Sequence, residues 1–153
     1  MNESELECLE FGVLRVKKVG SEPKWTRVPK VEEMENKEFA KQLEERTKKF
    51  AISIIKLSVL LPNTPEGRTI RTQITKSGTS IGANYREANR SRSKADFTNK
   101  IKICESESSE TIYWIEIITD MNWINTQKTE VIVSEANEIL AIFTTIGKKL
   151  KLW

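Results

Sequence analysis

The sequence predicts an all-α fold, an up-down-up-down antiparallel four-helix bundle preceded by an N-terminal extension. Apolar residues recur at alternating spacings of three and four along four long segments, and only short turns separate these segments. The chain has 153 residues with six glycines and four prolines, which suits one helix-rich domain. We therefore divide it into an extension or arm at residues 1–35 and a bundle domain at residues 36–153.

The four predicted helices follow each other closely. The first covers residues 37–61 and stops where Pro62 and Pro65 interrupt helical hydrogen bonding, and the second covers residues 68–89. The third starts near Lys94 behind a capping box in which Ser93 is the N-cap, and it ends near residue 122; the fourth starts at a Thr126 cap and runs almost to the end. The stripes expected to form the core are Leu43, Phe50, Ile54, Leu57 and Leu61; Ile70, Ile74, Ser77, Ile81, Asn84 and Ala88; Phe97, Ile101, Cys104, Ser108, Ile112, Ile115 and Ile118; and Ile132, Ala136, Ile139, Phe143, Ile146 and Leu150.

The extension has a different character. Residues 11–19 could form a short strand or an adhesive arm, and the segment that follows, with Pro23 and Pro29, resembles a linker. A loosely ordered extension is the alternative.

Composition restricts the chemistry. The sequence contains no histidine, so the commonest general base and the commonest metal ligand are missing. Cys8 and Cys104 are far apart and form no C-x-x-C, which favours two reduced thiols over a disulfide or a metal site. There is no membrane-length apolar run and no signal peptide pattern at the start. We expect a cytoplasmic protein without cofactor or metal.

The stretch Gly78-Thr79-Ser80-Ile81-Gly82 matches G-x-S-x-G, the nucleophile elbow of α/β-hydrolases. An elbow requires a strand, a sharp turn and a helix, with a histidine that activates the serine. The stretch instead lies inside a predicted helix, and no histidine exists. It does not match a P-loop either, because its glycines are too close together and no lysine follows them. We expect no catalytic residue here.

The same two glycines predict a packing surface. Gly78 and Gly82 lie four residues apart, on one side of the helix, and together with Thr75, Thr79 and Ala83 they form a smooth strip. Another backbone could approach this strip closely, either within the bundle or across an interface between subunits. We include both glycines among the candidate oligomer-interface residues.

Basic residues concentrate in one part of the chain. Between residues 68 and 102 there are nine lysines and arginines and only two carboxylates, Glu87 and Asp96, which leaves the rest of the chain net acidic. On a helical wheel, the basic residues of the second helix share one broad arc opposite the apolar stripe. Such a face could contact several phosphates, or it could be an ordinary solvated surface. The candidate nucleic-acid-binding residues are Arg68, Arg71, Lys76, Arg86, Arg90, Arg92 and Lys94.

Tyr113 and Trp114 flank the apolar stripe of the third helix on opposite sides. Aromatic side chains at the border of a core are more often subunit contacts or core edges than platforms for base stacking. We therefore add both to the candidate oligomer interface.

Three segments of the sequence resemble a known family. They are residues 71–88 (RTQITKSGTSIGANYREA), 93–103 (SKADFTNKIKI) and 107–115 (ESSETIYWI). They look like the bacterial four-helix bundle proteins encoded by intervening sequences in 23S ribosomal RNA genes, also labelled S23 ribosomal proteins. The similarity covers about residues 37–151, with Lys76 where the family motif usually has arginine, and residues 1–35 depart from the compact family member.

This resemblance implies a ring-like homopentamer without enzymatic activity and with a suspected role in binding RNA or DNA. The leading hypothesis is thus a non-enzymatic oligomeric bundle that binds nucleic acid through its basic second helix. The alternative is a protein-interaction scaffold, for example an accessory factor to a nucleic-acid enzyme. The weakest hypothesis is an enzyme whose metals are held by Glu87, Glu107 and Glu110, since bundle metal sites normally also use histidine.

Overall fold

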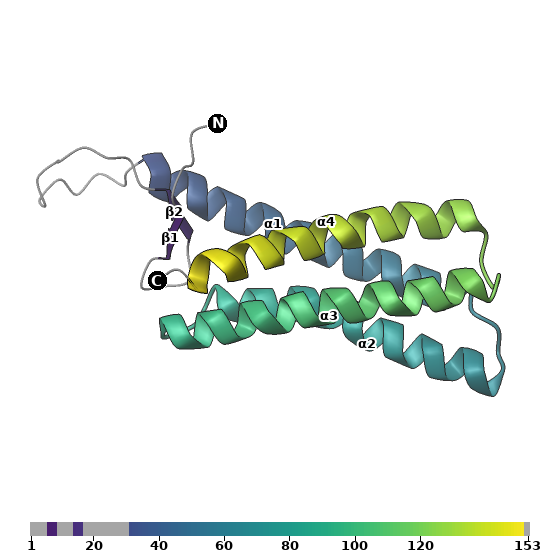
Figure 1. Cartoon of the computed structure of the whole chain (residues 1–153). Helices are drawn as coiled ribbons and strands as arrows, with labels where there is room; N and C mark the ends of the chain where they lie inside the picture. Colours follow the sequence, from purple (N-terminus) through teal and green to yellow (C-terminus); the bar gives the residue numbers. More distant parts are fainter. Residues whose placement is uncertain (1–5, 9–13, 17–30, 152–153) are drawn as a thin grey trace, which may run out of the picture.

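The computed structural model describes residues 6–8, 14–16 and 31–151, with side-chain packing for residues 36–150. Its main body is four helices in sequence: α1 (Val31–Ser58), α2 (Pro65–Ala88), α3 (Lys94–Asp120) and α4 (Thr126–Lys151). They lie side by side as an antiparallel bundle (Figure 1). The α1–α2 and α3–α4 turns lie at one end, and the α2–α3 turn lies at the other end with the start of α1 and the end of α4. The predicted all-α four-helix bundle is confirmed.

A small antiparallel pair of strands precedes the bundle. Strand β1 (Leu6–Cys8) pairs with β2 (Leu14–Val16), with Glu7 opposite Arg15. The second strand falls within residues 11–19, where a strand or an arm was expected. Residues 1–5, 9–13 and 17–30 lie outside the described part of the chain, and the linker interpretation of Pro23 and Pro29 falls there.

The core contains nearly every residue of the predicted stripes. Ten of the core side chains are fully shielded from solvent: Ile54, Ile74, Ile81, Ala88, Ile101, Cys104, Ile115, Ile118, Ile139 and Phe143. Only the stripe members at the borders, such as Ile70, Ile112 and Ile132, are partly exposed, and they still pack against the core. The core aromatics Tyr85 of α2 and Phe143 of α4 meet edge to face, with ring centroids 5.4 Å apart.

The helix ends follow local hydrogen bonding. Thr64 caps α2 by accepting a hydrogen bond from the Gly67 amide at 3.1 Å, and Pro65 follows it as the first helical residue. Ser93 accepts from the Asp96 amide at 3.1 Å, which confirms the predicted cap of α3. At α4 the prediction was off by one position, because Asn125 rather than Thr126 accepts from the amide of Gln127, at 2.8 Å.

The first helix differs most from its prediction. It begins at Val31, six residues earlier than expected, and it ends at Ser58 rather than at residue 61. Its last turn tightens, since the Leu60 amide donates to the Leu57 carbonyl at 3.0 Å and the chain then leaves the helix. Part of the predicted extension is therefore helical.

Candidate nucleic-acid interface

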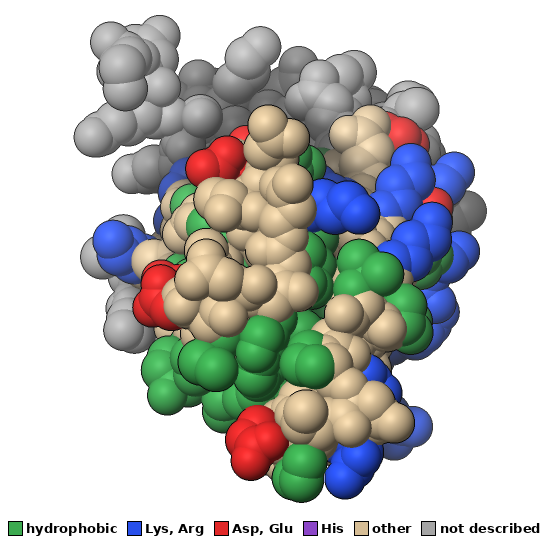
Figure 2. All heavy atoms as spheres, turned by 90° about the vertical axis from the view of Figure 1, so that its right-hand side faces the viewer, with side chains coloured by type: hydrophobic (Ala, Val, Ile, Leu, Met, Phe, Trp, Pro, Cys, Tyr) green, Lys and Arg blue, Asp and Glu red, His purple; other side chains and the backbone are tan. Residues whose placement is uncertain are grey.

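The outer face of α2 carries the predicted basic residues. Ile74, Ile81 and Tyr85 are buried on the inner side of this helix, so the residues about half a turn away point outward. Arg68, Lys76 and Arg86 are exposed there, as are Arg90 and Arg92 in the turn that follows and Lys94 at the start of α3. In an end-on view of the bundle, lysine and arginine side chains gather along one flank and few carboxylates lie among them (Figure 2). We call Arg68, Lys76, Arg86, Arg90, Arg92 and Lys94 the α2 basic surface.

Arg71 does not belong to this surface. Its Nε donates to the Ser58 carbonyl at 3.0 Å, and a terminal nitrogen donates to the Leu61 carbonyl at 2.6 Å. These carbonyls lie at the end of α1, where helical partners run out and a positive charge is favourable. These hydrogen bonds give Arg71 a structural role that the helical wheel could not reveal, because the acceptors belong to a neighbouring element; its predicted contact with nucleic acid stays a prediction.

Two members of the α2 basic surface are partly engaged. Arg68 donates to the Asn63 carbonyl and side chain at 3.3 and 3.1 Å but stays exposed. Arg86 Nε lies 3.8 Å from Glu44 Oε2 of α1, and the same carboxylate accepts from Asn89 at 2.8 Å. Glu44 therefore offsets part of the charge of Arg86.

Three cations without a charged partner among the described residues lie around the turn between α2 and α3. Within residues 36–150, the side chains of Arg90, Arg92 and Lys94 have neither an ion pair nor a hydrogen bond to a protein group. The two carboxylates of residues 68–102, Glu87 and Asp96, form no ion pair with these three cations. Glu87 pairs with Lys100 of α3, and Asp96 lies in the first turn of α3, where a negative charge is favourable. The cationic side chains of Arg90, Arg92 and Lys94 therefore face solvent without a charged partner in the described part of the chain.

Lys76 lies on the α3 side of the surface. Burial and the neighbouring Glu110 raise the pKa of the Glu107 carboxyl, and Lys76 acts in the opposite direction. Lys76 is therefore within electrostatic range of an α3 carboxylate.

The glycine strip is used inside the bundle. A Cβ at Gly78 would lie 2.8 Å from Cγ2 of Ile54, and one at Gly82 would lie 3.2 Å from Oγ1 of Thr47. Both neighbours belong to α1 of the same chain, and Gly78 is buried. Contact within the bundle therefore accounts for both glycines, and the expected role of Gly78 between subunits is replaced by close α1–α2 packing.

The residues weighed for catalysis have helical surroundings. Ser80 lies in the middle of α2 and donates its hydroxyl proton to the Lys76 carbonyl at 2.7 Å. In the described part of the chain, no group of three or more histidine, cysteine or carboxylate side chains is close enough to hold a metal ion. Glu87 forms an ion pair with Lys100. It does not form a common metal site with Glu107 and Glu110.

Tyr113 and Trp114 both lie on α3 but differ in exposure. Tyr113 is 54% exposed, whereas Trp114 packs partly against the core and donates its indole proton to Glu110 at 3.1 Å. Their rings meet edge to face with centroids 4.9 Å apart. Only Tyr113 offers a large area to a partner.

One feature was missed by the sequence reasoning. An apolar groove runs between α1 and α4, and it ends at an ion cluster formed by Arg46, Glu135 and Glu138. The available signal was apolar residues outside the stripes, such as Leu60 and Val131, which are 51% and 71% exposed. Which elements they face could not be known without the packing of the helices.

The class of protein is now defined: an all-helical four-helix bundle with a basic outer face on its second helix. A family model described as 23S rRNA-intervening sequence protein matches residues 34–145. The chain belongs to this family, as the motifs in α2 and α3 predicted.

A solved structure supports the assignment. It is a protein of unknown function from the S23 ribosomal protein family of Bacteroides thetaiotaomicron, 37% identical, with a TM-score of 0.65. The match covers 69% of this chain and 98% of that one. No curated protein matches the sequence. No helix in residues 31–151 is long and apolar enough to span a bilayer.

Proposed function

We propose that this protein is a non-enzymatic, oligomeric bundle that binds RNA or DNA through the α2 basic surface. The observation that carries the proposal is the trio Arg90, Arg92 and Lys94, which is exposed and has no carboxylate partner among residues 36–150. Unpaired cations that release counterions from phosphates supply most of the affinity in nonspecific nucleic-acid binding. A cytoplasmic location belongs to the same proposal, and the unpaired Cys104 thiol is compatible with a reducing compartment.

The shape of the surface supports backbone contact. Lys76 and Arg86 are separated by about 15 Å along α2, a length of about four base steps at 3.4 Å each. Thr72 and Ala83 lie exposed between the cations and are small, so a sugar-phosphate backbone could come close to the helix. Contacts of this kind position a nucleic acid without reading its sequence. We therefore expect binding with little sequence preference.

A titration at several salt concentrations tests this proposal. Full-length protein is titrated with a structured RNA and with a DNA duplex, and the variant Arg90→Gln/Arg92→Gln/Lys94→Gln is compared with wild type. We expect the slope of log K against log salt to fall by about one for each lost phosphate contact, with weaker binding to every sequence.

The matched control removes the same charge elsewhere. Lys41, Lys48 and Lys148 are exposed lysines on α1 and α4, and their replacement by glutamine should leave the salt slope near that of wild type. The proposal fails if wild type does not bind at low salt, or if the control triple weakens binding as much as the surface triple. Arg71→Gln serves as a second control, because it should lower stability and leave the slope unchanged.

Oligomerisation is the second part of the proposal. Family resemblance implies a homopentamer, and the exposed ring of Tyr113 is the candidate subunit contact. Copies of the α2 basic surface arranged around a symmetry axis would sum to a larger potential than one copy provides. Light scattering gives the subunit number, and a monomer at micromolar concentration would contradict this part.

A further inference from the structure

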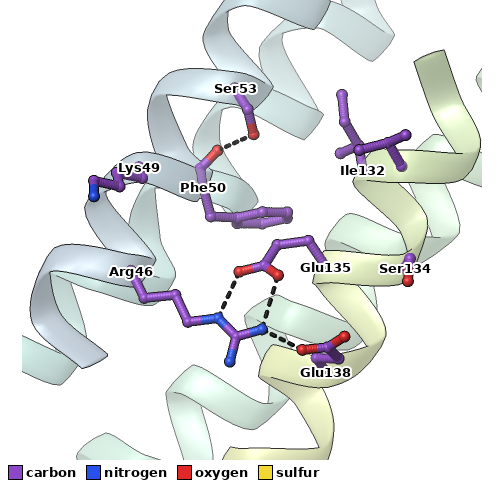
Figure 3. Close-up of a pocket in the computed structure, with 9 residues that line it drawn as sticks. Arg46, Lys49, Phe50, Ser53, Ile132, Ser134, Glu135 and Glu138 are labelled. Carbon is purple, nitrogen blue, oxygen red and sulfur yellow. Dashed lines mark hydrogen bonds and ion pairs between the residues drawn. The ribbon is translucent and has the colours of Figure 1, made fainter. Parts of the chain in front are cut away.

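The α1/α4 groove is an apolar feature of the described surface that the proposed function does not use. Two adjoining pockets share Ser53, Val131 and Ile132 and therefore form one continuous groove. Figure 3 shows one of these pockets, with the Phe50 ring pointing between the helices and Ile132 on the facing helix. The backbones of α1 and α4 come close to each other at far fewer positions than those of the other neighbouring helix pairs, and this leaves room for the groove. Its apolar lining is Phe50, Leu57, Leu60, Val131 and Ile132.

The groove has a closed end and an open end. At the closed end Arg46 spans the gap, with its Nε and a terminal nitrogen 2.7 and 2.8 Å from the two oxygens of Glu135, and it also contacts Glu138. At the open end Leu60 and Val131 are largely exposed. Between Arg46 and Leu57 the groove follows α1 for about 17 Å, the length of about three turns of helix, and Leu60 lies just past the end of that helix. This length fits a helical segment better than a small molecule.

The charge along the rim has one sign. Lys49 and Lys56 on α1 and Lys128 on α4 line the groove and are exposed. None of the three has an ion pair with a described residue. The only carboxylates that line it, Glu135 and Glu138, are both held by Arg46 at the closed end. The open part of the groove is therefore an apolar channel between unpaired cations.

From this arrangement we infer that the α1/α4 groove binds an amphipathic helix of a partner protein, one that carries acidic residues on both sides of its apolar stripe. The mode is helix-in-groove recognition, in which anchors at spacings of three and four enter the groove. Phe50, Leu57 and Ile132 receive these anchors, and the partner's carboxylates lie against Lys49, Lys56 and Lys128. Binding of a partner helix is a function beyond nucleic-acid binding, and it uses a surface separate from the α2 basic surface.

A second copy of the chain fits the groove less well. The chain does present an exposed apolar ridge, made by Ile52, Ile55 and Val59 on the outer side of α1. Lysines accompany this ridge, among them Lys48 and Lys56, and they would meet the lysines of the rim. Like charges brought together at an interface disfavour a partner. Charge therefore favours an acidic partner over self-association.

The test uses designed peptides as probes. A labelled helical peptide of about 15 residues carries leucines at spacings of three and four, flanked by glutamates. A second peptide keeps the leucines and replaces every glutamate by lysine. Fluorescence anisotropy with the full chain, free of nucleic acid, should give a dissociation constant of about 1–100 µM for the acidic peptide and far weaker binding for the basic one.

Two variants locate the binding site. Val131→Asp should weaken binding of the acidic peptide at least about tenfold, because it places a charge in the channel. Val131 is 71% exposed, so this variant should fold, which circular dichroism can check. Lys56→Glu/Lys128→Glu should exchange the preference between the two peptides. The matched controls Val59→Asp and Lys48→Glu change exposed residues outside the groove and should bind as wild type.

Each outcome decides the question. Binding of the acidic peptide that is lost in Val131→Asp and kept in Val59→Asp supports the inference. Equal binding of both peptides, no binding, or no effect of Val131→Asp overturns it. A fall in oligomer mass in Val131→Asp, measured by light scattering, would show that a second copy occupies the groove and would also overturn it. None of these results depends on whether the α2 basic surface binds nucleic acid.

Discussion

The two flanks of α1 show opposite ways of packing a helix. On one flank α2 comes so close that Gly78 leaves no room for a methyl group beside Ile54. On the other flank α4 stands away, and a groove with only the Arg46 cluster across one end separates the helices. The comparison teaches that the size of the side chains at a contact sets the distance between the two helices. Glycine lets α2 approach α1 closely, whereas Phe50, Ile132 and Val131 keep α4 apart from α1 and do not fill the space between them.

Thiol reactivity should give the largest difference between the closely packed interior, to which the α1–α2 contact belongs, and the open α1/α4 groove. Cys104 is buried near the α2–α3 contact, its Sγ donates to the Ile81 carbonyl at 3.4 Å, and burial raises the pKa of its thiol to about 12. In a Cys8→Ser background, we expect Cys104 to react with a disulfide reagent at least about a thousandfold more slowly at neutral pH than a free thiol. The reaction should become faster as pH rises, because only the thiolate reacts.

The matched variant places a thiol in the groove. Val131→Cys combined with Cys8→Ser and Cys104→Ser should react at nearly the rate of a free thiol, because Val131 is largely exposed. Comparable rates for the Cys104 thiol and for the thiol introduced by Val131→Cys would contradict the contrast between the closely packed interior of the bundle and the open α1/α4 groove. Stopped-flow absorbance measures both rates.

Substitution of a glycine should break the close flank. Gly78→Ala adds a methyl group that meets the branched Ile54 side chain, which cannot turn away easily. Overpacking of this kind costs about 1–3 kcal/mol in the free energy of unfolding, only partly offset by the better helix propensity of alanine. Urea unfolding followed by circular dichroism measures the change.

Gly147 in α4 provides the matched control. A Cβ there would lie 3.5 Å from the nearest other atom, an ordinary contact with Glu105. Gly147→Ala should therefore gain up to about 1 kcal/mol from helix propensity without any clash. If both alanine variants changed stability equally, the close approach of α1 and α2 would not be the reason for Gly78.

The smallest effect is expected at the Arg46 cluster. Hydrogen bonds from Arg46 to Glu135 and Glu138 raise the pKa of its guanidinium above the ordinary value, so it stays charged at every working pH. The pair is about one third exposed, and solvent screening limits its value to about 0.5–1 kcal/mol. Arg46→Met should lower the free energy of unfolding by that amount at low salt and by less at high salt.

Lys48→Met is the control for this variant. Lys48 is exposed on the same helix and has no ion pair among the described residues, so its replacement should leave stability nearly unchanged at any salt concentration. An Arg46→Met effect that did not depend on salt would show that packing, and not charge, accounts for the contact.

Much of the fold could be predicted because the periodicity of apolar residues reflects burial directly. Phe50, Ile81, Ile115 and Phe143 each come from a different predicted stripe, and all are buried. The start of α1 could not be placed, because Pro29 suggested a linker although proline is also common just before a helix. The chemistry of short caps was equally ambiguous, since Asn125 and Thr126 are both good N-cap residues.

The candidate site was less predictable because it depends on contacts between helices. A wheel places Arg71 and Arg86 on one arc, but it cannot show that Arg71 turns toward the end of α1 or that Arg86 meets Glu44. The groove was beyond prediction for the same reason, since it is defined by a gap between the first and the last helix. The exposure of Arg90, Arg92 and Lys94 could be predicted, because Arg90 and Arg92 lie in the turn before α3 and Lys94 is the first residue of that helix, where few neighbours can cover them.

The separation of Arg46 and Glu135 by 89 residues also bears on the order of folding. The α1–α2 pair joins through a short turn, so its close contact can form early, whereas the α1–α4 contact must wait until the whole chain has turned back on itself. Interactions formed after the transition state mainly slow unfolding. The Arg46 cluster should therefore form late in folding, and its loss should raise the unfolding rate more than it lowers the folding rate.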